Sequence, residues 1–193
     1  MSAQQAKQLL VEGNKRFVSG EIGQKELGAG RRIDLFENGQ FPFAVVLTCS
    51  DSRVPPELLF DQGLGQLFVV RVAGNVVDPV ALGSIEYGAE HLGAPLLVVL
   101  GHSNCGAVKA SVDGGEAPGS IGALVAKIKP SVDKMKAAGA SGANLYEKVE
   151  DENVRAVIAE IGESPVVQHL VQHGHLEVVG AKYLLDSGEV VFF

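Results

Sequence analysis

Three short apolar runs in the first half of the chain give the clearest pattern in the sequence. They are rich in Val and Leu at both odd and even positions, and they span residues 43–48, 67–72 and 96–101. Strands buried on both faces of a parallel sheet have this continuous pattern. Helical patterns follow the three runs, over residues 55–60, 78–91 and 104–112. Strands that alternate with helices predict βαβ units and a parallel sheet.

The second half of the chain is predicted to be helical until its last eighteen residues. Its helical patterns are broken by glycines and cover residues 121–138, 145–161 and 165–173. Residues 176–184 then predict a strand, and Asp186, Ser187 and Gly188 predict a turn before a last strand over 189–193. The expected fold class is therefore α/β, with a sheet of four mostly parallel strands, an antiparallel edge strand and helices on both faces.

The first forty residues predict a helix followed by an irregular arm. Ser2 can cap a helix that runs to about Phe17 and has an apolar face. Residues 18–42 are rich in glycine, which predicts a connector without regular structure. We predict one domain over residues 1–193, with an arm over 1–40 and a core over 41–193. The helix either packs on its own core or grips a second subunit, and its exposed apolar face favours association.

Composition and charge narrow the class of protein. The chain is 46% hydrophobic and 20% charged, which is typical of a folded globular protein. Its net charge of −7 argues against nucleic acid as the main partner. No apolar stretch approaches ~20 residues and no targeting segment is visible, so we predict a cytoplasmic protein that does not enter a membrane. Two cysteines are too few for a disulfide-rich secreted protein, so both thiols are expected to be free.

Candidate chemistry lies directly after two of the predicted strands. Cys49 follows the first strand, and His102 and Cys105 follow the strand over 96–101. The carboxyl ends of neighbouring parallel strands share one edge of a sheet, where ligands bind in open α/β folds. Two thiolates and an imidazole suit Zn²⁺ and leave a fourth position open, as catalytic zinc sites do. Buried thiols or a transient disulfide are the alternatives.

Asp51 and Arg53 add a second layer beside Cys49. A carboxylate at this position can accept a hydrogen bond from a zinc-bound water, and Arg53 can hold Asp51 ionised through a bidentate pair. Asp51 can instead bind the metal directly and close the site. The two residues can also be a simple ion pair within a loop.

The motif CSDSR at Cys49–Arg53, followed by GHSNCG at Gly101–Gly106, closely resembles the β-class carbonic anhydrases of the bacterial and plant-like branch. Segments 68–75 and 83–87 resemble further motifs of that family. The resemblance implies one Zn²⁺ per chain, held by Cys49, His102 and Cys105, and a catalytic pair formed by Asp51 and Arg53. It also implies the strand order 2-1-3-4.

The resemblance extends to a substrate pocket and to the assembly. It implies that Gln40 contacts substrate, that Phe68, Ala73 and Tyr87 form the wall, and that Gly106 offers a backbone N–H. By the same analogy the pocket lies at a subunit boundary of a homodimer or tetramer, with Gln40 serving the partner's zinc. Relatives that are inhibited by bicarbonate carry a Trp where this chain has Val46, so we expect no such inhibition here.

The activity implied is the reversible hydration of CO2 to bicarbonate and a proton, by attack of zinc-bound hydroxide. Two alternatives stay open at this point. One is a hydrolase of carbonyl sulfide or carbon disulfide on the same fold. The other is a non-catalytic zinc protein whose site Asp51 closes.

Overall fold

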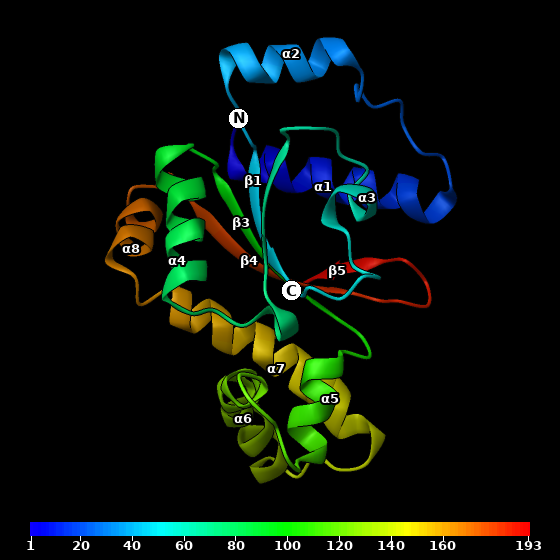
Figure 1. The fold of residues 1–193 in the computed structure, drawn as a ribbon, viewed down its shortest axis with the longest axis vertical. Coiled ribbons are helices and arrows are strands. Elements are labelled where there is room, and N and C mark those ends of the chain that lie inside the picture. The colour runs from blue at the N-terminus through cyan, green and yellow to red at the C-terminus, as the bar shows by residue number, and fades with distance from the viewer.

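A five-stranded sheet forms the centre of the computed structural model, which describes all residues 1–193 (Figure 1). The strand order is β2-β1-β3-β4-β5, and only the β4–β5 pair is antiparallel. The strands are β1 (Ala44–Thr48), β2 (Leu67–Arg71), β3 (Leu96–His102), β4 (Glu177–Tyr183) and β5 (Val190–Phe192). The predicted fold class and strand order are confirmed.

Helices connect the parallel strands, as the alternating pattern predicts. Their bounds are α1 (Ala3–Ser19), α2 (Ala29–Asn38), α3 (Pro56–Leu59), α4 (Pro79–Glu86), α5 (Gly106–Asp113), α6 (Ile121–Ala137), α7 (Ala143–Ile161) and α8 (Pro165–Gln172). Two short elements complete the list, a 3-10 turn η1 (Ala73–Asn75) and a π-helical turn η2 (Tyr87–His91) that continues α4. None of the helices is long and apolar enough to cross a membrane.

The sheet is buried on both faces, which explains its unbroken apolar runs. Alternate residues of β1 point to opposite sides: Val45 and Leu47 pack with α4, α7 and α8, whereas Val46 packs with α1 and α3. A third apolar cluster lies between α5, α6 and α7 and includes Cys49 and Cys105. The carboxyl ends of β1 and β3 therefore meet helical packing rather than open solvent.

The helix α1 packs on its own chain. Ala6 and Leu10 are fully buried against the sheet, and Asn14 hydrogen-bonds the carbonyls of Leu59 and Gly188. Of the two alternatives for this helix, ordinary packing is the one found. The apolar face of α1 is covered only in part: Ala6 and Leu10 are buried against the sheet and α3, whereas Leu9 and Val18 are 37% and 43% exposed.

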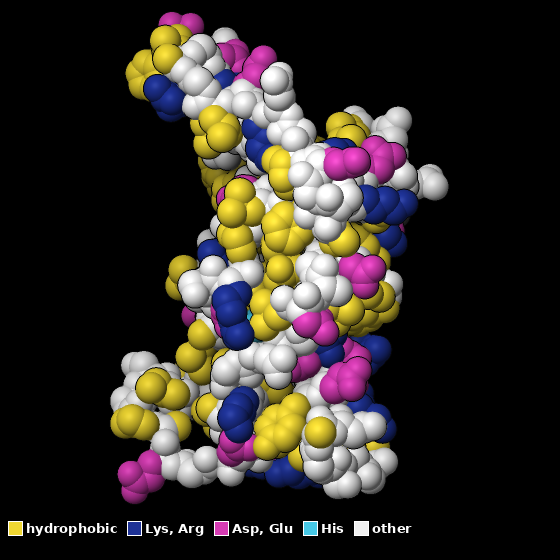
Figure 2. Space-filling model, turned by 90° about the vertical axis from the view of Figure 1, so that its right-hand side faces the viewer, with side chains coloured by type: hydrophobic (Ala, Val, Ile, Leu, Met, Phe, Trp, Pro, Cys, Tyr) yellow, Lys and Arg dark blue, Asp and Glu magenta, His cyan; other side chains and the backbone are white.

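The connector predicted over residues 18–42 is instead helical over Ala29–Asn38. Glycines flank this helix, and Gly39 ends it with a φ of +82°, a conformation that favours glycine. No residue of α2 is buried, and Phe36 is 89% exposed. The glycines therefore mark the ends of a helix that projects from the body of the molecule (Figures 1 and 2).

The close approach of α1 to α3 gives a stability prediction. A Cβ on Gly13 would lie 1.8 Å from the carbonyl oxygen of Phe60. We expect Gly13→Ala to destabilise the protein by about 1–3 kcal/mol, as overpacking does. In a chain of this size that lowers the melting temperature by roughly 2–10 °C in a thermal unfolding scan.

The matched control is Gly83→Ala, on the exposed surface of α4, where no atom lies within 4 Å of the added methyl group. This variant should keep or slightly raise the melting temperature, since alanine is the better helix former. Equal losses in the two variants would contradict the packing explanation.

Candidate metal centre

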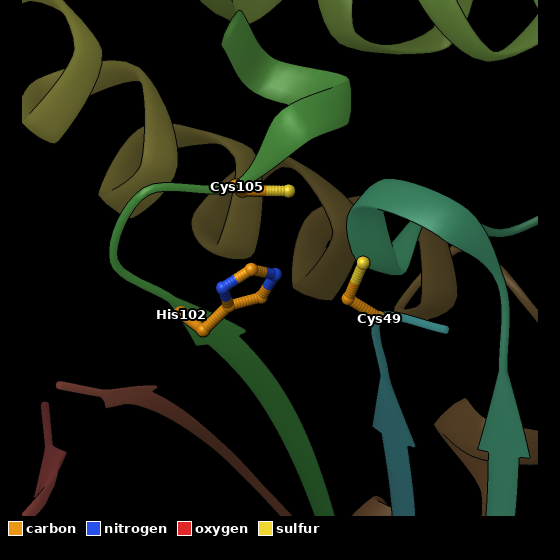
Figure 3. Close-up of side chains that lie close together, drawn as sticks. All are labelled: Cys49, His102 and Cys105. Carbon is orange, nitrogen blue, oxygen red and sulfur yellow. The ribbon is translucent and has the colours of Figure 1, made fainter. Parts of the chain in front are cut away.

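Three potential metal ligands converge at the carboxyl edge of the sheet. Cys49 follows β1, His102 ends β3, and Cys105 immediately precedes α5. Because β1 and β3 are paired in parallel, their ends meet at one edge. The two sulfurs and a ring nitrogen all lie within 4.8 Å of one another, and all three residues are buried. Figure 3 shows the three side chains pointing toward a common centre, Cys49 from just after β1, His102 from the end of β3 and Cys105 from the loop that follows β3.

The turn η1 fixes the position of Cys49. The backbone N–H of Gly74 donates a hydrogen bond to the Cys49 sulfur at 3.2 Å. Gly74 has a φ of +72°, and a Cβ there would lie 2.7 Å from Ile128. Only glycine therefore fits the conformation and the space that bring this N–H to the sulfur.

The loop after β3 fixes His102 and Cys105. Ser103 is bonded to β4 through its backbone, and its hydroxyl accepts a hydrogen bond from the backbone N–H of Leu185. Asn104 takes a left-handed conformation with a φ of +54°, which turns the chain sharply. This turn brings Cys105 back toward His102 only three residues later.

The environment of His102 fits a metal ligand. Its Nδ1 lies 2.9 Å from the carbonyl oxygen of Ser103, which assigns the ring proton to Nδ1. Its Nε2 is buried and has no hydrogen-bond partner. A buried nitrogen lone pair is costly unless it binds something, so the ring is oriented as a ligand.

The two thiols influence each other's ionisation. The nearby Cys105 thiol and His102 ring, together with the hydrogen bond from the Gly74 N–H, lower the pKa of Cys49 despite its burial. The same contact with Cys49, reinforced by burial and by repulsion from its negative charge, raises the pKa of Cys105. One of the two sulfurs therefore ionises readily alone, whereas both can ionise together only beside a cation.

Asp51 and Arg53 form a bidentate ion pair beside these ligands. The Arg53 guanidinium donates to Oδ1 at 2.9 Å and to Oδ2 at 2.7 Å, and the Arg53 backbone N–H also donates to Oδ1. The Arg53 hydrogen bonds hold the pKa of Asp51 well below its usual range. Asp51 Oδ2 lies 3.9 Å from His102 Nε2, so the carboxylate borders the three ligands.

Arg71 fixes the loop that carries this pair. Its guanidinium donates to the carbonyls of Cys49 and Asp51 at 3.1 and 2.7 Å. Sequence reasoning had no role for Arg71 in holding these residues. The signal available was its place at the end of β2, which pairs with β1 and so ends beside the CSDSR loop.

The residues expected to line a pocket fall into two groups. Ala73 begins the turn that orients Cys49, and Gly106 follows Cys105 at the first turn of α5, where backbone N–H groups lack helical partners. Gln40 is exposed and precedes β1, so within one chain it lies toward the opposite edge of the sheet from Cys49.

Phe68 and Tyr87, like Gln40, belong to the group that lies away from Cys49. Their rings lie 6.0 Å apart, and Phe68 is aligned with Val45, four residues before Cys49. Tyr87 is 47% exposed on the π-helical turn η2 and stacks on His91. The single chain therefore does not bring Gln40, Phe68 and Tyr87 to its own Cys–His–Cys cluster.

Comparison with known proteins places this arrangement in a family. A family model described as "Carbonic anhydrase" matches residues 44–190. Carbonic anhydrase 2 of Mycobacterium tuberculosis is 40% identical over 186 residues, which cover 94% of this chain and 88% of that protein. A carbonic anhydrase of Mycolicibacterium smegmatis is 42% identical with the same coverage.

Solved structures agree with the sequence comparisons. The β-carbonic anhydrase CcaA aligns with a TM-score of 0.74 at 27% identity, covering 97% of this chain and 87% of that one. The Coccomyxa β-carbonic anhydrase, solved with acetazolamide, also has a TM-score of 0.74, at 29% identity over 95% of this chain and 84% of its own. The match across nearly the whole chain, in sequence and in fold, shows that this protein belongs to the β-carbonic anhydrase family.

Proposed function

We propose that this chain catalyses the zinc-dependent, reversible hydration of CO2 to bicarbonate and a proton. The observation that carries the proposal is a buried set of two thiols and an imidazole, with an unbonded Nε2, beside an ionised Asp–Arg pair. Two soft thiolates and an imidazole favour zinc over harder divalent cations. Family membership supports the reaction type.

Cys49, His102 and Cys105 would hold the zinc, one ion per chain. A zinc ion bound there supplies Lewis-acid activation of a water molecule. Two thiolates offset the charge of the ion, so the ionisation that enables activity should lie above pH ~7, the value reached with neutral ligands.

Asp51 acts as the orienting acceptor. Its carboxylate lies beside the three ligands and accepts a hydrogen bond from the attacking oxygen, which fixes the direction of the lone pair that reacts. Arg53 keeps this carboxylate ionised and in one orientation through two parallel hydrogen bonds. The backbone N–H of Gly106, at the free end of α5, stabilises the developing bicarbonate oxygen.

A second copy of the chain completes the pocket. Gln40, Phe68 and Tyr87 lie apart from the sulfur and imidazole ligands of their own chain, so they would line the site of a partner. The helix α2 and the segment after it carry exposed Ile33, Phe36 and Phe41, apolar side chains that a homodimer or tetramer would cover. We place the protein in the cytoplasm, where its two free thiols stay reduced.

The direct test combines two measurements on one purified sample. Stopped-flow hydration of CO2 should show catalysis, and metal analysis should find one zinc per chain. A parallel assay with carbonyl sulfide separates CO2 hydration from the related hydrolase activity. Zinc-loaded protein without CO2 hydration would overturn the proposal.

The ligand role of the thiols predicts loss of metal. Cys105→Ser removes one of the three donors and leaves a buried hydroxyl that binds zinc weakly. Metal analysis of the purified variant should find well under one zinc per chain, and CO2 hydration should be lost with it. Full zinc occupancy in this variant would remove Cys105 from the ligand set.

The role of Asp51 predicts loss of rate without loss of metal. Asp51→Asn keeps the shape of the side chain but removes its charge, so kcat for CO2 hydration should fall by roughly 10²-fold or more. The zinc content should stay at one per chain. The control is Ser52→Ala in the same loop, an exposed position whose substitution should leave kcat unchanged.

The charge of the ligand set predicts an alkaline activity profile. The value of kcat/KM for CO2 hydration should rise as the pH increases from 6 to 9, because the two thiolates weaken the acidifying effect of the metal. The lowered pKa of Asp51 means that its carboxylate stays ionised across this range and does not cause the rise. A flat profile would contradict this account of the site.

A further inference from the structure

One face of α7 reaches both of the segments that carry the sulfur ligands. Glu150, Asn153 and Val154 are buried on this face, at the spacing that places residues on one side of a helix. The helix runs below the carboxyl ends of the strands (Figure 1). The proposed mechanism uses none of these side chains.

Glu150 contacts the segment of Cys105. Its Oε1 accepts a hydrogen bond from the backbone N–H of Cys105 at 3.3 Å. Cys105 is the residue directly before α5, so this N–H has no partner within the helix. The carboxylate therefore satisfies an otherwise free donor and fixes the backbone that carries the second sulfur.

Lys182 holds Glu150 in place. Its ammonium group lies 2.9 Å from Glu150 Oε2 and 3.0 Å from Asp151 Oδ1, and the side chains of Lys182 and Glu150 are both more than nine-tenths buried. Lys182 is aligned with Gly101 in the sheet, one residue before His102. A buried ion pair is weak evidence for stability alone, so its position beside a ligand is the informative feature.

Asn153 acts on the other sulfur through one intermediate peptide. Its side-chain amide donates to the carbonyl oxygen of Gly74 at 2.9 Å, and Asn153 is 1% exposed. The N–H of the same Gly74 donates to the Cys49 sulfur. Asn153 thus fixes the residue whose N–H reaches that sulfur.

Close packing anchors α7 at this point. A Cβ on Gly101 would lie 2.6 Å from Val154 Cγ2, so β3 and α7 approach each other directly beside His102. Glu150 lies one helical turn before Val154, and Asn153 directly precedes Val154. The position of both polar side chains is therefore set by a contact with the strand that carries the third ligand.

We infer that α7 positions both sulfur ligands of the metal, with Glu150 tethering the backbone of Cys105 and Asn153 orienting the peptide that hydrogen-bonds Cys49. The inference rests on the proposed zinc site. Residues that orient metal ligands typically change metal affinity or activity by about 10–100-fold when altered. Glu150 and Asn153 are positioning residues, since neither lies among the three ligands.

The test for Glu150 measures zinc release to a chromogenic chelator from the fully loaded protein. Glu150→Asp keeps the charge but shortens the side chain away from Cys105, so release should be about 10-fold faster or more. Glu150→Gln keeps an oxygen acceptor for the Cys105 N–H, and Asp151 still pairs with Lys182. This variant should release zinc within about 3-fold of the unmodified protein, well inside the range that marks lost ligand support.

The matched control is Glu147→Asp, an exposed position one turn earlier on α7, which should release zinc at the unmodified rate. If Glu150→Gln is as fast as Glu150→Asp, the hydrogen bond to Cys105 is not the cause and the tether is overturned. Release at the unmodified rate from folded Glu150→Asp overturns it as well.

The test for Asn153 measures a spectrum that simple packing would not change. In cobalt-substituted protein, Asn153→Ala should move the sulfur-to-cobalt charge-transfer band to lower energy, because a thiolate that accepts a weaker hydrogen bond gives up electrons more easily. Asn144→Ala, an exposed position on the same helix, should leave the band unchanged. An unchanged band in folded Asn153→Ala overturns the role of Asn153.

Circular dichroism and thermal unfolding establish that each variant is folded. If Glu150→Asp fails to fold, the spectrum of Asn153→Ala still decides whether α7 acts on a sulfur ligand. Measurements on the unmodified protein distinguish a failure of the proposed function from a failure of the role of α7. If it binds no zinc or does not hydrate CO2, the proposed function fails. If it does both while the variants match it, only the role of α7 fails.

Discussion

Two sulfur atoms that are buried side by side constrain this protein more than any other feature. Each thiolate disfavours the other, and burial disfavours both, so the pair is stable in its doubly ionised form only beside a cation. The register of β1 and β3 brings the sulfurs and the imidazole to one place. The surrounding peptide groups then determine how closely the three donors meet.

The sheet and the loops contribute at different scales. Parallel pairing of β1 with β3 places Cys49 and His102 at one edge, but strand spacing alone leaves neighbouring chains ~4.8 Å apart. The finer adjustment comes from single hydrogen bonds, such as those from the Gly74 N–H to the Cys49 sulfur and from His102 Nδ1 to the carbonyl oxygen of Ser103. These bonds need backbone conformations with positive φ at Gly74 and Asn104, which other residues rarely adopt.

Much of this arrangement could be predicted from the sequence because its signals are local. Unbroken apolar runs identify buried strands, and cysteine and histidine directly after two such runs identify a shared edge. The helix over 29–38 could not be predicted in this way, since its flanking glycines resemble those of a loop and none of its side chains is buried. Ile33 and Phe36 lie one helical turn apart, and this apolar face was the signal that could have identified the helix.

The contacts from α7 were beyond sequence reasoning for a different reason. Glu150 meets Cys105 across 45 residues, and Asn153 meets Gly74 across 79, so no short motif links the partners. The contacts of Arg71 were equally hard to predict, because its two partners are backbone carbonyls, which every residue type carries. Residues that act through backbone groups are therefore the hardest to identify from one sequence.

The proposed pocket divides one site between two chains, with Gln40, Phe68 and Tyr87 on one chain and the Cys–His–Cys set on the other. The sheet carries the metal ligands at its carboxyl edge, whereas these three residues lie nearer the amino ends of β1 and β2. Within one chain the two groups therefore lie apart. In the proposed homodimer or tetramer, the Cys–His–Cys set of one chain would face these residues of the other. The exposed apolar residues of α2 and Phe41 then have the same physical origin as the incomplete pocket: both are surfaces that a single chain leaves uncovered.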